Sequence, residues 1–60
     1  MIKMKCKENY YGFEKGKLYT VKNNHTTVFE LADNSKTVHK FSKNYNDEYP
    51  NFRKYFELIQ

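Results

Sequence analysis

The chain has 60 residues, a formal net charge of +4 and a single cysteine. A domain of this size buries only about 60% of the surface that its unfolded chain exposes, so its stability is marginal. One cysteine excludes an internal disulfide, and secreted chains this small normally carry several, so we expect a reducing cytoplasm. No run approaches the ~18 apolar residues of a membrane span, and residues 1–7 lack the apolar stretch of a signal peptide, so we expect neither.

Aromatic residues make up 18% of the chain, which predicts a folded single domain over residues 1–60 despite the charged and polar composition. The plainer explanation of the positive charge is that it keeps the protein soluble. The alternative is that it attracts a polyanion.

The chain opens with a strict alternation, "IKMKCK" over residues 2–7. Ile2, Met4 and Cys6 share one face and three lysines share the other, which predicts a half-buried strand. Three further strand-like runs follow, at residues 17–23, 26–32 and 36–42, separated by turn-forming residues. Phe29 and Leu31 share a face of the second of these runs.

The C-terminal part is harder to assign. Pro50 bars a regular element from running through residues 43–51. The run at residues 52–59 fits both a helical and a strand pattern. We expect a helical turn near residues 47–52 and a short last strand at 54–59. Five short strands with tight connections predict a small barrel, because closure removes exposed sheet edges.

Two motifs are similar to those of SH3 domains. "FEKGKLYTV" at residues 13–21 resembles the diverging turn of that family, with Gly16 at the turn, and "YPNF" at residues 49–52 resembles the stretch that forms a 3₁₀ turn before the last strand. The resemblance implies an all-β, five-stranded SH3-like barrel with a short helical (3₁₀) turn before the last strand. The chain has no tryptophan, which the family uses to grip proline-rich ligands, and only five residues between Lys7 and Phe13 where the family has a long loop.

The closer resemblance is to the truncated SH3-like barrels among small proteins of bacterial phages and prophages. It implies a protein that binds, and in some cases blocks, a host protein in the bacterial cytoplasm.

Residues for catalysis or metal binding do not form a recognisable pattern. Cys6 belongs to the apolar face of its strand, which favours a core residue over a reactive thiolate. His25 and His39 have no metal-ligand spacing, and the acidic residues are scattered. We therefore expect no enzyme, no metal and no cofactor.

The tyrosines are the first candidate for a binding surface. Phe13, Phe29, Phe41 and Phe56 are the natural core, so the barrel cannot also enclose every tyrosine. The partner-binding candidates lie in the two irregular segments: Tyr10, Tyr11, Tyr45 and Tyr49. Tyrosine is enriched at interfaces because it offers apolar area and one hydroxyl. The alternative is that these tyrosines only cap the ends of the barrel.

The lysines are the second candidate. Basic grooves with stacking rings bind single-stranded nucleic acid in small barrels. The candidate residues are Lys3, Lys5, Lys7, Lys22, Lys40 and Lys54. A solvated strand face that discourages edge pairing is the plainer explanation. We prefer a protein partner, with a nucleic acid, an assembly role and a homodimer as alternatives.

Overall fold

The computed structural model describes residues 1–44 and 48–59. This part of the chain forms five strands and one short 3₁₀ helix, with no α-helix among the described residues. The elements are β1 (Lys3–Cys6), β2 (Leu18–Asn24), β3 (Val28–Ala32), β4 (Val38–Ser42), η1 (Phe52–Lys54) and β5 (Phe56–Leu58). The predicted all-β architecture with a 3₁₀ turn before the last strand is confirmed.

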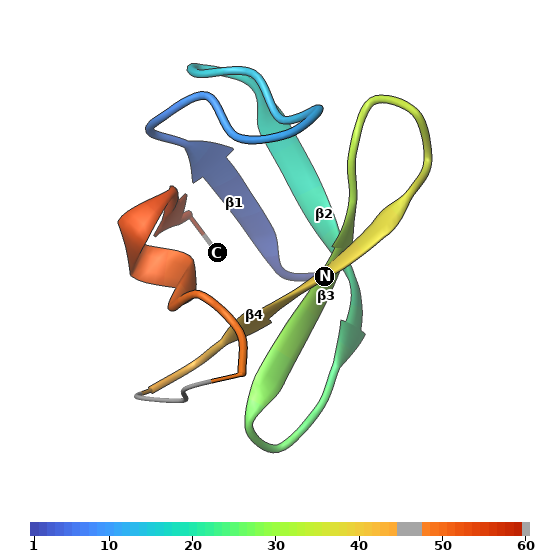
Figure 1. The fold of residues 1–60 in the computed structure, drawn as a ribbon, viewed down its shortest axis with the longest axis vertical. Coiled ribbons are helices and arrows are strands. Elements are labelled where there is room, and N and C mark those ends of the chain that lie inside the picture. The colour runs from blue at the N-terminus through green and yellow to red at the C-terminus, as the bar shows by residue number, and fades with distance from the viewer. Residues whose placement is uncertain (45–47, 60) are drawn as a thin grey trace.

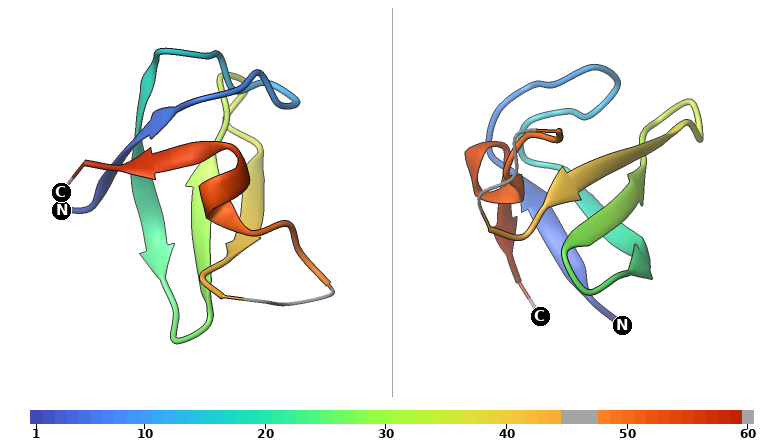
Figure 2. Two further views of the ribbon diagram at one scale, coloured as in Figure 1. Left: turned by 90° about the vertical axis from the view of Figure 1, so that its left-hand side faces the viewer. Right: turned by 60° about the horizontal axis from the view of Figure 1, so that its bottom comes forward.

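The strands form one antiparallel sheet in the order β4-β3-β2-β1-β5. The sheet curls into a half-barrel, so that β1 and β5 form one wall and β3 and β4 form the other (Figures 1 and 2). β1 therefore lies inside the sheet, between β2 and β5. Its lysines therefore cannot protect an outer edge of the sheet, and of the plainer explanation only the solvated strand face remains.

The alternation of β1 is confirmed, because Met4 and Cys6 are buried while Lys3 and Lys5 are exposed. The register carries this pattern to both neighbours. Met4 is opposite Tyr19 on β2, and Cys6 is opposite Phe56 on β5. Directly opposed residues of an antiparallel pair share a face, so Tyr19 and Phe56 enter the core, whereas Leu58, also opposite Met4, is 51% exposed.

Aromatic rings fill the space between the two walls. Phe41 of β4 contacts Phe56 of β5, and Phe29 of β3 contacts Phe52 of η1, both with ring centroids 5.1 Å apart in T-shaped geometry. The buried apolar residues are Met4, Cys6, Phe13, Tyr19, Phe29, Leu31, Phe41, Phe52 and Phe56. The predicted burial of the four core phenylalanines is thus confirmed, and Phe52 joins them.

The helical turn, Phe52–Lys54, begins only at the last residue of the range 47–52 that we expected, of which residue 47 lies outside the described residues. The side chain of Asn51 caps it by accepting a hydrogen bond from the backbone of Arg53. The residue before it, Pro50, is held beside β4, since its carbonyl accepts a hydrogen bond from the Ser42 backbone. Asn51 follows with extended backbone, and the turn starts only after it.

Two local features shape β2. Gly16 precedes it in a turn with φ of +89°, as predicted, a conformation that favours glycine. A β-bulge between Val21 and Asn23 then shifts the register against β3. Bulges bend strands and increase their twist, which favours a curled sheet. No helix among the described residues has the length and apolar character needed to cross a membrane.

Candidate binding surface

A tight turn in the β1–β2 connection presents Tyr11 to solvent. The backbones of Tyr10 and Phe13 exchange two hydrogen bonds, at 3.0 and 2.6 Å, and Gly12 between them has φ of +85°. Phe13 is buried in the core, while Tyr11 at the tip is 79% exposed. Phe13 thus anchors the turn, and the exposed ring of Tyr11 projects from it.

Tyr10 supports Tyr11 from beneath. Its ring lies 4.9 Å from that of Tyr11 in edge-to-face geometry and 4.2 Å from that of Tyr55, with Phe41 behind it at 5.6 Å. Loss of water around its hydroxyl raises the pKa of Tyr10. Tyr10 is therefore a half-buried residue that packs beneath Tyr11, and little of its own surface is exposed to solvent.

The structure does not gather the four predicted tyrosines into one set. Tyr10 and Tyr11 touch, but Tyr49 lies beside β4, where the ammonium of Lys40 is 5.7 Å from the centre of its ring. Tyr45 lies outside the described residues.

Tyr55 belongs to the surface instead, and the sequence analysis did not single it out as a binding residue. No local pattern marks it, because Tyr55 lies just before β5 and packs, half-buried, against the rings of Tyr10 and Phe41. We call Tyr10, Tyr11 and Tyr55 the tyrosine platform.

Three of the six candidate lysines share one surface. Lys3, Lys5 and Lys7 are exposed on the outer side of β1 and its extension. Leu18 and Glu57 are the neighbours of Lys5 on the same face, on β2 and β5 respectively. The row is therefore basic but interrupted by an acidic and an apolar side chain.

The other three lysines are exposed on separate elements. Lys22 is at the bulge of β2, and Lys40 is on β4 opposite Glu30. Lys54 is in η1, with its ammonium 5.8 Å from the ring centre of Tyr55. Of the six candidate lysines, only Lys54 places its ammonium beside a ring of the tyrosine platform.

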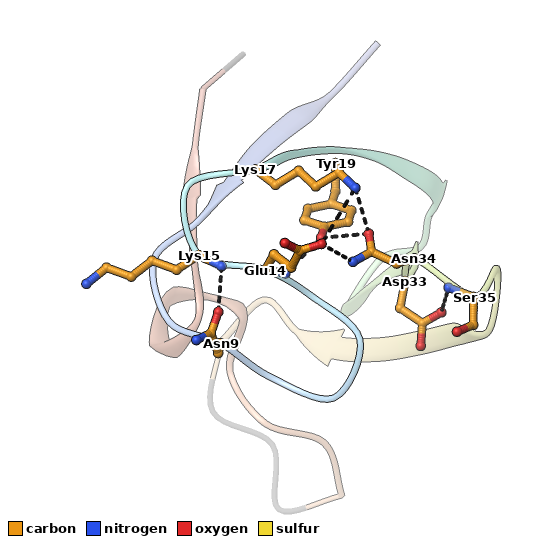
Figure 3. A network of polar contacts seen from close by, with 8 residues as sticks. All are labelled: Asn9, Glu14, Lys15, Lys17, Tyr19, Asp33, Asn34 and Ser35. Carbon is orange, nitrogen blue, oxygen red and sulfur yellow. Dashed lines mark hydrogen bonds and ion pairs between the residues drawn. The ribbon is translucent and has the colours of Figure 1, made fainter.

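A network of polar contacts attaches the β1–β2 connection to the β3–β4 hairpin (Figure 3). The hydroxyl of Tyr19 accepts a hydrogen bond from the backbone of Glu14 and donates one to the side chain of Asn34. The amide of Asn34 also donates to the carboxylate of Glu14 and accepts from the ammonium of Lys17. The buried hydroxyl of Tyr19 is thus fully satisfied, which a polar group in a core requires.

A second attachment lies directly under the tyrosine turn. The backbone of Asn34 donates to the carbonyl of Gly12 at 3.0 Å. Asp33 packs so close to Gly12 that a Cβ atom at that position would lie 2.7 Å from the Asp33 carboxylate. We call these contacts, together with the network around Tyr19, the hairpin clasp. It holds the turn against the β3–β4 hairpin and so fixes the direction in which Tyr11 projects.

Asp33 is itself held by several donors. Nε2 of His39 lies 2.8 Å from one carboxylate oxygen, and the backbones of Ser35 and Thr37 donate to the other. The hydrogen bond from His39 is the main cause that lowers the pKa of Asp33. The His39 ring also packs against Tyr10 and Phe13. His39 therefore has a packing and hydrogen-bonding role between the clasp and the platform.

The described residues offer little for covalent or metal chemistry. Burial raises the pKa of the Cys6 thiol, which donates to the carbonyl of Glu8, so the thiolate is disfavoured. No group of three or more potential metal ligands occurs in residues 1–44 and 48–59.

Comparison with known proteins found no match. No family model, no curated protein and no solved structure is similar to the chain at a significant level.

Proposed function

We propose that the chain is a non-enzymatic binding protein whose tyrosine platform contacts another protein. The observation that carries this proposal is Tyr11, an aromatic side chain 79% exposed at the tip of a turn that the hairpin clasp holds in place. Rigid, exposed tyrosines lose little conformational entropy on binding and are frequent anchors of interfaces.

We further propose that the fold is a truncated SH3-like barrel of the kind found in small phage and prophage proteins. The strand order and the position of η1 directly before β5 support this assignment. Under it the partner is a host protein in the bacterial cytoplasm, and binding would block that protein.

Binding of a nucleic acid is the second candidate function. It is favoured by the row of Lys3, Lys5 and Lys7 and by Lys54 beside Tyr55. The row lies on the outer face of a central strand and includes Glu57 as a neighbour of Lys5. The single arginine of the chain, Arg53, already donates to the carbonyl of Lys43. We therefore rank the protein partner first.

Two variants separate the two functions. Tyr11→Ala removes the exposed ring, and a triple change of Lys3, Lys5 and Lys7 to Gln removes the basic row. All four positions are exposed, so both variants should melt close to the wild-type temperature. The tagged proteins are used to purify partners from bacterial lysate, and labelled single-stranded and duplex oligonucleotides are titrated in parallel at several salt concentrations.

Under our proposal one protein is recovered with wild type and with the triple-lysine variant, and is lost with Tyr11→Ala. Nucleic-acid binding predicts the reverse, with affinity that falls by about 0.9 log units per log unit of salt for each duplex phosphate contacted. Tight oligonucleotide binding that the triple change abolishes would therefore overturn the preferred function.

A further inference from the structure

The proposed function does not involve the outer edge of β5, which is the side of this strand that faces away from β1. β5 stands at one end of the strand order and pairs only with β1 among the described strands. At the other end of the sheet, β4 is partly covered, because the backbone of Ser42 donates to Pro50 and forms a bridge with Asn51. In Figure 2 (left), β5 lies at the front of the molecule.

The register identifies which backbone groups of β5 face this edge. Ile59 donates to the carbonyl of Lys3 at 2.9 Å, and Lys7 donates to that of Tyr55 at 2.6 Å. Hydrogen bonding alternates along an antiparallel pair, so Glu57 also directs its backbone groups to β1. The N–H and C=O groups of Phe56 and Leu58 consequently point outward.

Apolar side chains accompany these outward backbone groups. Leu58 is the last residue of β5 and Ile59 follows it. Their side chains are 51% and 46% exposed. Edge strands are usually protected by lysine or proline, and the only charge on β5 is that of Glu57. The edge is thus suited to pair with another strand.

We propose that β5 pairs antiparallel with β5 of a second copy of the chain, about a twofold axis beside Leu58. In this register the two Leu58 residues are opposite each other and exchange both backbone hydrogen bonds, as their outward orientation requires. Glu57 of each copy is then opposite Ile59 of the other, and no like charges face each other.

The neighbouring registers are unfavourable, which is why the proposal names this one. Placing Phe56 opposite Leu58 of the second copy would set Glu57 directly opposite Glu57, which is destabilising. Placing Phe56 opposite Phe56 would set Leu58 opposite Lys54, which belongs to η1 and is not extended.

The association is expected to be weak, because β5 has only three residues. Sedimentation equilibrium over a wide concentration range should show the mean mass of wild type rising toward that of two chains. Leu58→Lys places two lysines opposite each other and should abolish the rise. Leu18→Lys is the matched control: Leu18 is 56% exposed but lies on β2, away from the edge, so this variant should associate like wild type.

A third variant tests the register, and its expected effect is stronger association and not a loss of association. Ile59→Lys would put a lysine opposite Glu57 twice in the dimer and should tighten association by up to about tenfold at low salt, a gain reduced by Lys3, which is opposite residue 59 in the same chain. Melting temperatures confirm that each variant is folded. A wild type that stays monomeric at all concentrations overturns the proposal, as does equal loss with Leu18→Lys and Leu58→Lys. Loss of association in Tyr11→Ala would also overturn it, because the contact would then be the tyrosine platform.

Discussion

Tyr10, Tyr11 and Phe13 show how closely spaced aromatic residues acquire different roles. The tight turn at Gly12 directs Phe13 into the core and Tyr11 into solvent, while Tyr10 packs between them against Tyr55. The abundance of rings in so short a segment is thus partly packing and partly exposed surface. A residue's position in an irregular segment did not by itself predict exposure, because Tyr10 is covered by a ring from a distant part of the chain.

The burial of Phe29 predicts a large effect of its removal. Phe29→Ala deletes a ring packed against Phe52 and leaves a cavity between the two walls of the sheet. The free energy of unfolding should fall by roughly 3–5 kcal/mol, which approaches the whole stability of a small domain. Urea unfolding measures it, with the exposed Leu18→Ala as a control expected to change stability by less than about 0.5 kcal/mol. An unchanged urea midpoint for Phe29→Ala would contradict the core assignment.

The contacts of Asp33 predict a dependence of stability on acid. The pKa of its carboxyl is lower in the folded chain than in the unfolded chain, where it is about 3.9. Folding therefore gains stability from Asp33 above that value, and this gain is lost as pH falls through the lower pKa of the folded state. Asp33→Asn should be less stable than wild type at neutral pH and should lose less stability on acidification.

Melting temperatures of wild type and Asp33→Asn between pH 2 and 6 measure this difference. Glu8→Gln, which removes an exposed carboxylate outside the clasp, is the control. Parallel curves for wild type and Asp33→Asn would show that Asp33 does not link folding to pH.

At the scale of elements, the hairpin clasp joins two connections that are distant in sequence. Gly12 is needed there for two reasons, its φ of +85° and the close approach of Asp33. Gly16 has nearly the same φ, but no atom beyond Gly16 itself and its two chain neighbours lies within 4 Å of where its Cβ would be. Comparing substitutions at Gly12 and Gly16 therefore separates the free-energy cost of the backbone conformation from the free-energy cost of the steric contact.

Gly12→Ala should therefore destabilise the chain more than Gly16→Ala. Both variants carry a penalty of about 1–2 kcal/mol for a left-handed alanine. Only Gly12→Ala must also displace the carboxylate of Asp33 and lengthen the hydrogen bond from Asn34. Chemical unfolding measures both, and NMR chemical shifts of residues 33–37 should change only in Gly12→Ala. Equal losses of stability would show that the contact with Asp33 does not constrain the turn.

The elements that the sequence predicted well are those with local signals. The alternation of residues 2–7 identified β1 and its buried face, and Gly16 marked a turn. The bulge after Val21 has no such signal, because it depends on how β2 meets β3. The position of η1 and the platform role of Tyr55 likewise depend on contacts with β4 and Tyr10, which no local pattern encodes.

At the scale of the whole molecule, residues 52–58 complete the core that β1–β4 begin. Phe52 and Phe56 pack against rings of β3 and β4, and β5 pairs with β1. Without these residues, the curled sheet formed by β1–β4 therefore lacks part of one wall and two of its core rings. Small domains depend on every large buried side chain, because so little surface is buried in total.

A chain truncated after Asn51 should consequently lack a cooperative unfolding transition, since two core rings and one strand are missing. Adding a peptide of residues 52–60 at high concentration should restore dispersed NMR signals from β1 and β4, because the peptide supplies the strand that pairs with β1 and both rings. The same peptide with Phe56→Ala should fail to do so, since it would leave a cavity opposite Phe41. A truncated chain that unfolds cooperatively at the wild-type temperature would show that β5 and η1 are accessory to the fold. In that case β5 could also detach from β1 without unfolding the rest of the chain.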